Sequence, residues 1–286
     1  MTNTQHNAQP SRQIVYSTPG MPASDGDGVK MTRIIGTPHL DMLDPFLMLD
    51  CFESDQPQDY IGGFPDHPHR GFETVTYMLA GRMRHKDSMG NEGVIAAHGV
   101  QWMRAGKGIV HSEMPEQESG LLKGFQLWVN LPSKDKMCEP AYQEFVANDL
   151  ALQMREDGGQ VRVVAGHTNE GTVGPVTRED IKPIFMDVNL PAGGTFTQAI
   201  KAGDSAFIYA ISGDVLVGDE QVLYTRQLGI LGEGNSVTIT ACETEAQFLL
   251  VAATPINEPV ARGGPFVMNT KEQVMQAFND YRNNRF

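Results

Sequence analysis

Short apolar stretches, separated by glycine, proline, aspartate and asparagine, follow one another from residue 33 to residue 255. Stretches of about four to eight residues rich in Val, Ile, Phe, Tyr and Thr are typical of β-strands. Over residues 184–190 the side chains alternate with a period of two, as they do in a strand with one buried face. Long helical periodicity is scarce, which favours an all-β barrel or sandwich over an alternating β–α fold.

One helix is predicted, in the C-terminal stretch NTKEQVMQAFNDYRNNRF at 269–286. Thr270 and Gln273 have the spacing of a capping box, in which each side chain bonds to the backbone of the other. Val274, Phe278 and Tyr281 then fall on one helical face. We expect this helix to pack on the barrel.

The two halves of the chain resemble each other. The sequence YMLAG at 77–81 is matched by YAISG at 209–213, and GKG at 106–108 by GEG at 232–234. These matches indicate two copies of one β unit, with a boundary where the strand pattern breaks between about residues 135 and 160. Because each match covers only a few residues, chance similarity is the alternative.

The charge balance excludes some classes of partner. The chain has 286 residues, with 22 Lys and Arg against 35 Asp and Glu, a net charge of −13. This acidity argues against direct nucleic-acid binding, and no apolar run reaches the ~20 residues that a membrane helix needs. The polar N-terminus MTNTQHNAQPSRQ lacks a secretory signal, and three distant cysteines indicate reduced thiols, so we expect a cytoplasmic protein.

Histidine is concentrated in the first part of the chain, because all eight lie at or before His167. His67 and His69 form one pair at spacing i, i+2, and His111 and Glu113 form another. Residues at this spacing point to the same face of a strand. If both strands face one barrel interior, three imidazoles and one carboxylate converge on a first-row divalent metal and leave coordination positions open. An incidental His-x-His is the alternative.

Two further features bear on this site. Glu73 follows His69 by four residues, so a regular strand would turn it to the same face, as a ligand, an orienting partner or a base. A plain hydrogen-bonding role is the alternative. Each candidate ligand lies a fixed number of residues from one of the repeated glycines. The positions at the same distances from the glycines of the second half are Ala199, Lys201, Val237 and Ile239. We therefore predict one metal per chain, in a domain at 1–145, and a domain at 146–286 that lacks ligands and ends in the helix.

Several motifs carry a specific resemblance. GGFPDHPHRGFETVTYMLAG at 62–81, HKDSMGNEGVI at 85–95, QWMRAGKGIVHSEMP at 101–115 and GGPFVMNT at 263–270 closely resemble the pirin family of the cupin superfamily. The resemblance implies two jelly-roll-like cupin β-barrels packed face to face, with a short C-terminal helix. It also implies one iron, as Fe(II), in the first barrel, with nickel, manganese, copper or zinc as alternatives. By analogy the ligands are His67, His69, His111 and Glu113, whereas Glu73 occupies the carboxylate position of the general cupin motif.

The resemblance leaves two functions open. Some bacterial pirins resemble quercetin 2,3-dioxygenases, which open a flavonol ring with O2; this implies a small phenolic substrate, with Glu113 or Glu73 as the base. Phe64, Arg70 and Trp102 flank the ligands and are candidates to line the pocket, with core packing or, for Arg70, a surface salt bridge as the alternative. Animal pirins resemble iron-dependent transcriptional coregulators, and other bacterial relatives are linked to regulation of metabolic enzymes. The alternative is therefore a redox-sensing regulator without enzymatic activity that binds a protein partner.

Overall fold

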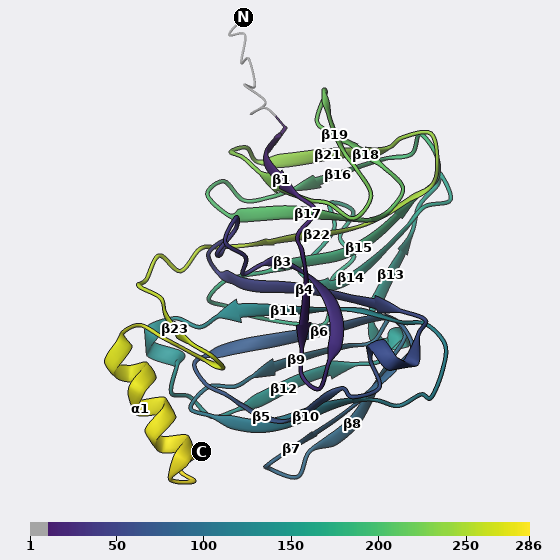
Figure 1. Cartoon of the computed structure of the whole chain (residues 1–286). Coiled ribbons are helices and arrows are strands. Elements are labelled where there is room, and N and C mark those ends of the chain that lie inside the picture. The colour runs from purple at the N-terminus through teal and green to yellow at the C-terminus, as the bar shows by residue number, and fades with distance from the viewer. Residues whose placement is uncertain (1–10) are drawn as a thin grey trace, which may run out of the picture. The chain divides into compact units, whose positions relative to one another are not determined.

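The chain forms two compact β-barrel units in a computed structural model that describes residues 11–286. Residues 1–10, which make up most of the N-terminal stretch that lacks a predicted secretory signal, lie outside the described residues. We call residues 20–150 with 256–286 the N-terminal barrel unit, and residues 151–255 with 11–19 the C-terminal barrel unit. The prediction of an all-β fold of two cupin barrels with one short helix at the C-terminus is confirmed (Figure 1).

The N-terminal barrel unit contains two antiparallel sheets. Its seven-stranded sheet has the order β12 (Ala141–Phe145), β9 (Val100–Arg104), β6 (Phe72–Ala80), β11 (Leu122–Asn130), β4 (Phe46–Ser54), β3 (Val29–Ile35) and β2 (Met21–Asp25). Its four-stranded sheet has the order β5 (Phe64–His69), β10 (Ile109–Pro115), β7 (Arg82–Asp87) and β8 (Glu92–Ala96). Short 3-10 turns lie at Pro57–Asp59, Ser133–Asp135 and Ala147–Asp149.

The C-terminal barrel unit repeats this arrangement. Its seven-stranded sheet has the order β1 (Ile14–Thr18), β20 (Leu228–Leu231), β17 (Ser205–Ser212), β22 (Ala246–Ala253), β15 (Ile184–Leu190), β14 (Gln160–Ala165) and β13 (Ala151–Met154). Its four-stranded sheet has the order β16 (Thr195–Ala199), β21 (Ser236–Ala241), β18 (Val215–Val217) and β19 (Gln221–Leu223). Strands at matching positions follow one another in the same chain order in both units, apart from the edge strands β12 and β1, which supports duplication over chance similarity.

The repeated glycines have a shared structural cause. Gly81 follows β6 and Gly213 follows β17, and both have positive φ angles, of 80° and 67°. A side chain is strained in this backbone region. At Gly213 a Cβ would also collide with the carbonyl oxygen of Glu245. The glycine that ends each repeated sequence is therefore required by the turn that leaves the strand.

The two units differ from the predicted domains of 1–145 and 146–286 at both ends of the chain. Strand β1 pairs with β20, so the N-terminal strand belongs to the C-terminal barrel unit. The hairpin of β23 (Ala261–Gly263) and β24 (Phe266–Met268), and the helix α1 (Lys271–Arg282), belong to the N-terminal barrel unit. The physical reason is edge pairing: each terminal segment finds its hydrogen-bond and packing partners in the unit that is distant in sequence.

The C-terminal helix begins as predicted. The Thr270 hydroxyl accepts a hydrogen bond from the Gln273 backbone at 3.3 Å, and the Gln273 side chain accepts one from the Thr270 backbone at 3.1 Å. Val274 is buried, and the ring of Phe278 lies 4.8 Å from that of Phe266. Among the described residues, no helix has both the length and the apolar character that a membrane span needs.

Candidate metal centre

Three histidines meet in the N-terminal barrel unit. Strands β5 and β10 pair antiparallel with His111 opposite His67, and His69 lies two residues further along β5. One ring nitrogen from each histidine lies within 4.8 Å of the others. Pro68 is compatible with this strand because β5 is the edge of its sheet, where a missing N–H costs least. The i, i+2 spacing and the cross-strand pair therefore bring the imidazoles together, as predicted.

The protonation of these rings suits metal binding. His67 Nδ1 lies 2.8 Å from the Pro65 carbonyl oxygen and donates to it, which leaves its Nε2 as a lone pair 3.0 Å from His69 Nε2. Both ring nitrogens of His111 are buried and have no hydrogen-bond partner among the described residues. Burial, and next the neighbouring imidazoles, hold the pKa values of His69 and His111 well below the usual value. Buried, neutral imidazoles that face one another fit a divalent first-row cation.

Glu113 lies outside this group of three, on the same buried face of β10 as His111. Its two carboxylate oxygens contact the Thr76 hydroxyl and the Gln126 amide nitrogen, each at 2.7 Å. The Thr76 hydroxyl is also 2.9 Å from Gln126 Oε1. The single hydroxyl proton of Thr76 can be donated to only one of its two oxygen neighbours. If the Gln126 amide is flipped, its oxygen faces the Glu113 carboxylate instead, again without a proton between the two oxygens. These three contacts therefore lack one hydrogen, and a proton or a bound cation would fill that place.

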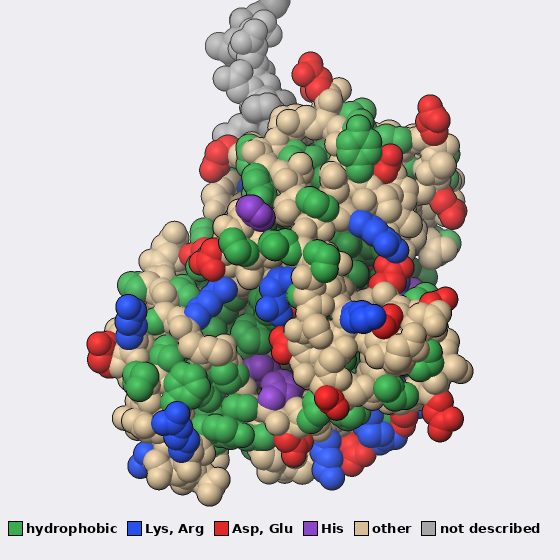
Figure 2. Space-filling model, in the orientation of Figure 1, with side chains coloured by type: hydrophobic (Ala, Val, Ile, Leu, Met, Phe, Trp, Pro, Cys, Tyr) green, Lys and Arg blue, Asp and Glu red, His purple; other side chains and the backbone are tan. Residues whose placement is uncertain are grey.

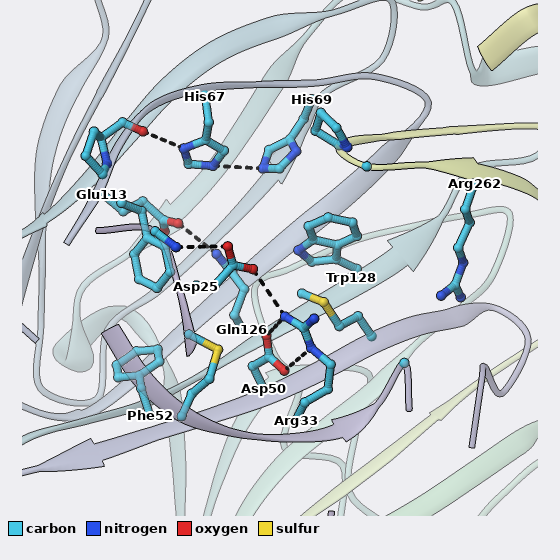
Figure 3. Close-up of a pocket in the computed structure, with 18 residues that line it drawn as sticks. Asp25, Arg33, Asp50, Phe52, His67, His69, Glu113, Gln126, Trp128 and Arg262 are labelled. Carbon is cyan, nitrogen blue, oxygen red and sulfur yellow. Dashed lines mark hydrogen bonds and ion pairs between the residues drawn. The ribbon is translucent and has the colours of Figure 1, made fainter. Parts of the chain in front are cut away.

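A cavity of about 540 Å³ opens beside the histidines (Figure 3). His67, His69 and Glu113 line it together with apolar side chains from β3, β4, β5 and β11, namely Met31, Met48, Phe52, Phe64 and Trp128. The volume lies within the range of about 300–1,000 Å³ that small-molecule sites occupy. Figure 2 shows histidine side chains that are visible from outside at the floor of a hollow. The cavity can therefore admit a small, largely apolar molecule up to the imidazoles.

One wall of the cavity carries an ion network. Arg33 donates to Asp50 from Nε at 2.9 Å and from Nη2 at 2.8 Å, and Nη2 also lies 3.2 Å from Asp25. Burial raises the pKa of Asp50, whereas its hydrogen bonds with Arg33 act in the opposite direction. The same hydrogen bonds raise the pKa of Arg33. The charge of Arg33 is thus already neutralised by protein carboxylates.

Two further buried polar residues lie beside the site, on the neighbouring strand β7. Its residues His85 and Asp87 are buried and pair with Glu113 and His111 across the sheet. His85 Nε2 lies 2.7 Å from Glu144, which lowers the pKa of that carboxyl, and Asp87 accepts a hydrogen bond from Tyr142 at 2.8 Å. These contacts join β7 to β12.

The structure places Glu73 on the opposite face of β6 from the site. Gly71, with a φ of +86°, separates β5 from β6 and breaks the alternation that the sequence argument assumed. Phe72 therefore contacts His69, with ring centroids 5.0 Å apart, and Glu73 points away. Its carboxylate accepts a hydrogen bond from the Trp102 indole at 2.8 Å. Both side chains are buried, and neither lines the cavity.

Arg70 also turns away from the cavity, although it follows His69 directly. Its guanidinium donates to the Lys107 carbonyl oxygen and, at 2.7 Å, to Asp280 of α1, and it lies 4.2 Å from the centroid of the Phe286 ring. Arg70 therefore ties the ligand strand to the C-terminal segment. Of the three predicted substrate contacts, Phe64 lines the cavity, whereas Arg70 and Trp102 do not.

Sequence reasoning missed Gln126 and Trp128. Both lie on β11, two residues apart, so they share one face of that strand, and both line the cavity. The Trp128 ring packs against Phe72 at 4.2 Å and His69 at 5.2 Å between centroids. Their i, i+2 spacing indicates that they share a face, but only the packing of the two sheets shows that this face of β11 is directed toward β5 and β10.

Among the described residues, the C-terminal barrel unit has no equivalent histidine cluster. Val237 and Ile239 on β21 are fully buried and apolar. The pairing of β16 with β21 places Gln198 opposite Val237, one residue from Ala199, the position that the glycine offset predicted. The shift arises because the connection between strand and glycine differs in length between the two units.

Comparison with known proteins agrees with this architecture. The family model described as pirin matches residues 28–129, and the model of the pirin C-terminal cupin domain matches residues 185–286. A "Pirin-like protein" of Caulobacter vibrioides is 52% identical, over 97% of this chain and 100% of the relative. A Pseudomonas aeruginosa protein named "Putative quercetin 2,3-dioxygenase" is 45% identical, over 95% of this chain and 96% of that protein.

A solved structure also resembles the chain throughout. The structure of a quercetin 2,3-dioxygenase from Acinetobacter baumannii superposes with a TM-score of 0.88 at 34% identity, over 96% of this chain and 98% of the other. Together with the family models, this likeness shows that the chain belongs to the pirin family of cupin proteins.

Proposed function

We propose that this chain is a metal-dependent dioxygenase that opens the ring of a flavonol-type phenol, such as quercetin, with O2. The observation that carries the proposal is the convergence of three buried or half-buried imidazoles, two of which line a largely apolar cavity. The names of the Pseudomonas and Acinetobacter relatives support the same reaction.

His67, His69, His111 and Glu113 would hold one divalent ion, which we propose is Fe(II), with nickel, manganese, copper and zinc as alternatives. When bound, the ion lowers the pKa of a hydroxyl that coordinates it and so makes the aromatic substrate electron-rich. His69 and His111 supply neutral donors without losing a proton, because burial already disfavours the imidazolium form of both.

Glu113 would take the proton of the substrate hydroxyl. Its carboxylate is held in place by Thr76 and Gln126, and the ring of three contacts is complete when one proton is added. A base that is positioned before the substrate arrives contributes about 10²- to 10⁴-fold to a proton-transfer step. Glu73 cannot share this role from the far side of β6.

The apolar walls would orient the substrate. Phe64 and Trp128 line the same cavity as His69 and Glu113, so a planar ring that reaches the imidazoles contacts aromatic side chains. Filling this space with an aromatic ring also displaces water from the reacting hydroxyl.

The test is O2 consumption by metal-loaded protein with quercetin, followed with an oxygen electrode after elemental analysis. We expect turnover with the wild-type protein and a loss of at least about 100-fold in Glu113→Gln, whose amide keeps a similar shape but cannot accept the proton. Metal content is measured in both proteins, so that a lost ion is distinguished from a lost base. Absence of turnover at full metal occupancy would contradict the proposal.

Membership of the pirin family also supports the alternative, a redox-sensing regulator that binds a protein partner. In that case a change of metal oxidation state would alter the affinity for the partner. Recovery of a partner that differs between oxidised and reduced protein, without O2 consumption, would favour the regulator.

A further inference from the structure

Two arginines line the cavity beside the histidines, and their partners differ. Arg33 is held by Asp50 and Asp25, as described above. Arg262 lies on β23 and donates from Nη2 to the Leu47 carbonyl oxygen at 2.8 Å. Its paired carboxylate, Asp41, is 3.9 Å from Nη1 and has a side chain that is 84% exposed. Within the described part of the chain, Arg262 is thus the cavity cation without a hydrogen-bonded carboxylate.

Trp128 lies between this guanidinium and the histidines in the close-up view (Figure 3). Its indole is fixed by contacts with Phe72 and His69, and it forms part of the cavity wall. A planar ligand that lies along Trp128 therefore has imidazoles at one end and a guanidinium at the other. The cavity of about 540 Å³ is large enough for such a ligand.

The surroundings of Arg262 favour an anion. Its side chain is 28% exposed, so it has lost much of its hydration yet can still be reached from the cavity. Burial lowers the pKa of Arg262, whereas the charge of Asp41 acts in the opposite direction. The planar fork of N–H donors matches the geometry of a carboxylate, and such charged hydrogen bonds are stronger than neutral ones.

We propose that Arg262 forms an anion subsite, and that the ligand is a planar aromatic molecule with a metal-binding hydroxyl at one end and a carboxylate at the other. The metal end of this inference rests on the proposed function, whereas the carboxylate end rests on Arg262 and Trp128. The subsite selects among phenolic substrates, because an uncharged flavonol leaves the guanidinium without an anion.

The test measures binding rather than turnover. Nickel-loaded protein is titrated without O2 with 3-hydroxyflavone and with its 3′- and 4′-carboxylates, and the dissociation constants are read from the flavonol absorbance. We expect one carboxylate isomer to bind about tenfold tighter than the uncharged parent, as one charge-assisted interaction implies. Arg262→Gln should remove this preference, and Arg262→Lys should restore part of it.

The matched control is Arg82→Gln, which removes an exposed arginine on β7 that does not line the cavity. This variant should keep the wild-type preference. Equal binding of all three probes to the wild-type protein, or a preference that survives Arg262→Gln, would overturn the subsite. O2 consumption with the uncharged parent is measured separately: turnover without a preference rejects the subsite alone, whereas a preference without turnover supports the subsite and rejects the dioxygenase.

Discussion

Apart from the edge strands β12 and β1, the two barrel units have the same strand order, but the side chains that face inward from their smaller sheets differ in polarity. On β10, His111 and Glu113 face inward, whereas the corresponding β21 presents Val237 and Ile239. The interior of the C-terminal barrel unit is a continuous cluster of aliphatic and aromatic side chains, which includes both β21 residues and Phe248. In the N-terminal barrel unit, the equivalent region holds three histidines and a cavity.

This difference shows that the fold and the candidate metal site depend on different residues. Buried polar groups that lack partners cost about 1–3 kcal/mol each, so the interior of the N-terminal barrel unit is less favourable than that of the other. The antiparallel ladders are nevertheless retained in both units, because they depend on backbone hydrogen bonds and on the apolar faces of the larger sheets. A few inward positions on β5 and β10 therefore change the chemistry while the topology stays the same.

The largest effect is expected from removing a histidine of the cluster. His69→Ala should abolish stoichiometric metal binding and O2 consumption, because two imidazoles cannot hold the ion as three do. Elemental analysis after dialysis measures the metal. His167→Ala, which changes an exposed histidine of the C-terminal barrel unit, is the control and should bind metal normally. Full metal occupancy in His69→Ala would contradict the assignment.

Placing a histidine in the filled barrel should destabilise it. Val237→His puts an imidazole into a fully buried apolar site without partners, and we expect a loss of about 2–4 kcal/mol in unfolding free energy. Urea unfolding followed by circular dichroism measures this loss. Thr238→His, at the next residue on the other face of β21, is the matched control. An equal loss of unfolding free energy in both variants would mean that burial of the imidazole on the inner face of β21 does not cause the loss.

Metal binding should stabilise only the N-terminal barrel unit. At a free metal concentration of 100 times the dissociation constant, the expected gain is about 2.7 kcal/mol. Both tryptophans, Trp102 and Trp128, lie in this unit, so their fluorescence reports its unfolding specifically. A gain that appears in His69→Ala as well would indicate metal binding elsewhere.

The smallest predicted effect is a pH dependence of the metal-free protein. The folded-state pKa values of His69 and His111 are depressed, so below the ordinary value of about 6.5 the unfolded chain binds more protons than the folded one. The free energy of unfolding therefore decreases as the pH falls below this value, by up to about 1.4 kcal/mol per pH unit for each histidine. Urea unfolding followed by tryptophan fluorescence at pH 7, 6 and 5 measures the slope. His111→Val should reduce it, and an unchanged slope would contradict this origin.

The sequence by itself determined the all-β class, the duplication, the helix cap at Thr270 and the grouping of three histidines. These features depend on local periodicity and on short spacings within one strand or turn, which a linear pattern records directly. The resemblance of the motifs at 62–81 and 101–115 to the pirin family also implied the two cupin barrels.

The tertiary structure alone decided which face each strand turns to its neighbours. The backbone conformation of Gly71 directs Glu73 away from the site. The contacts of Arg70 with Asp280 and Phe286 hold the Arg70 side chain outside the cavity. Only the packing of the two sheets and of the β23–β24 hairpin brought Trp128 and Arg262 to the same cavity as the histidines. The reason is physical: such contacts join residues far apart in the chain, so they depend on strand pairing and side-chain packing, which no local spacing encodes.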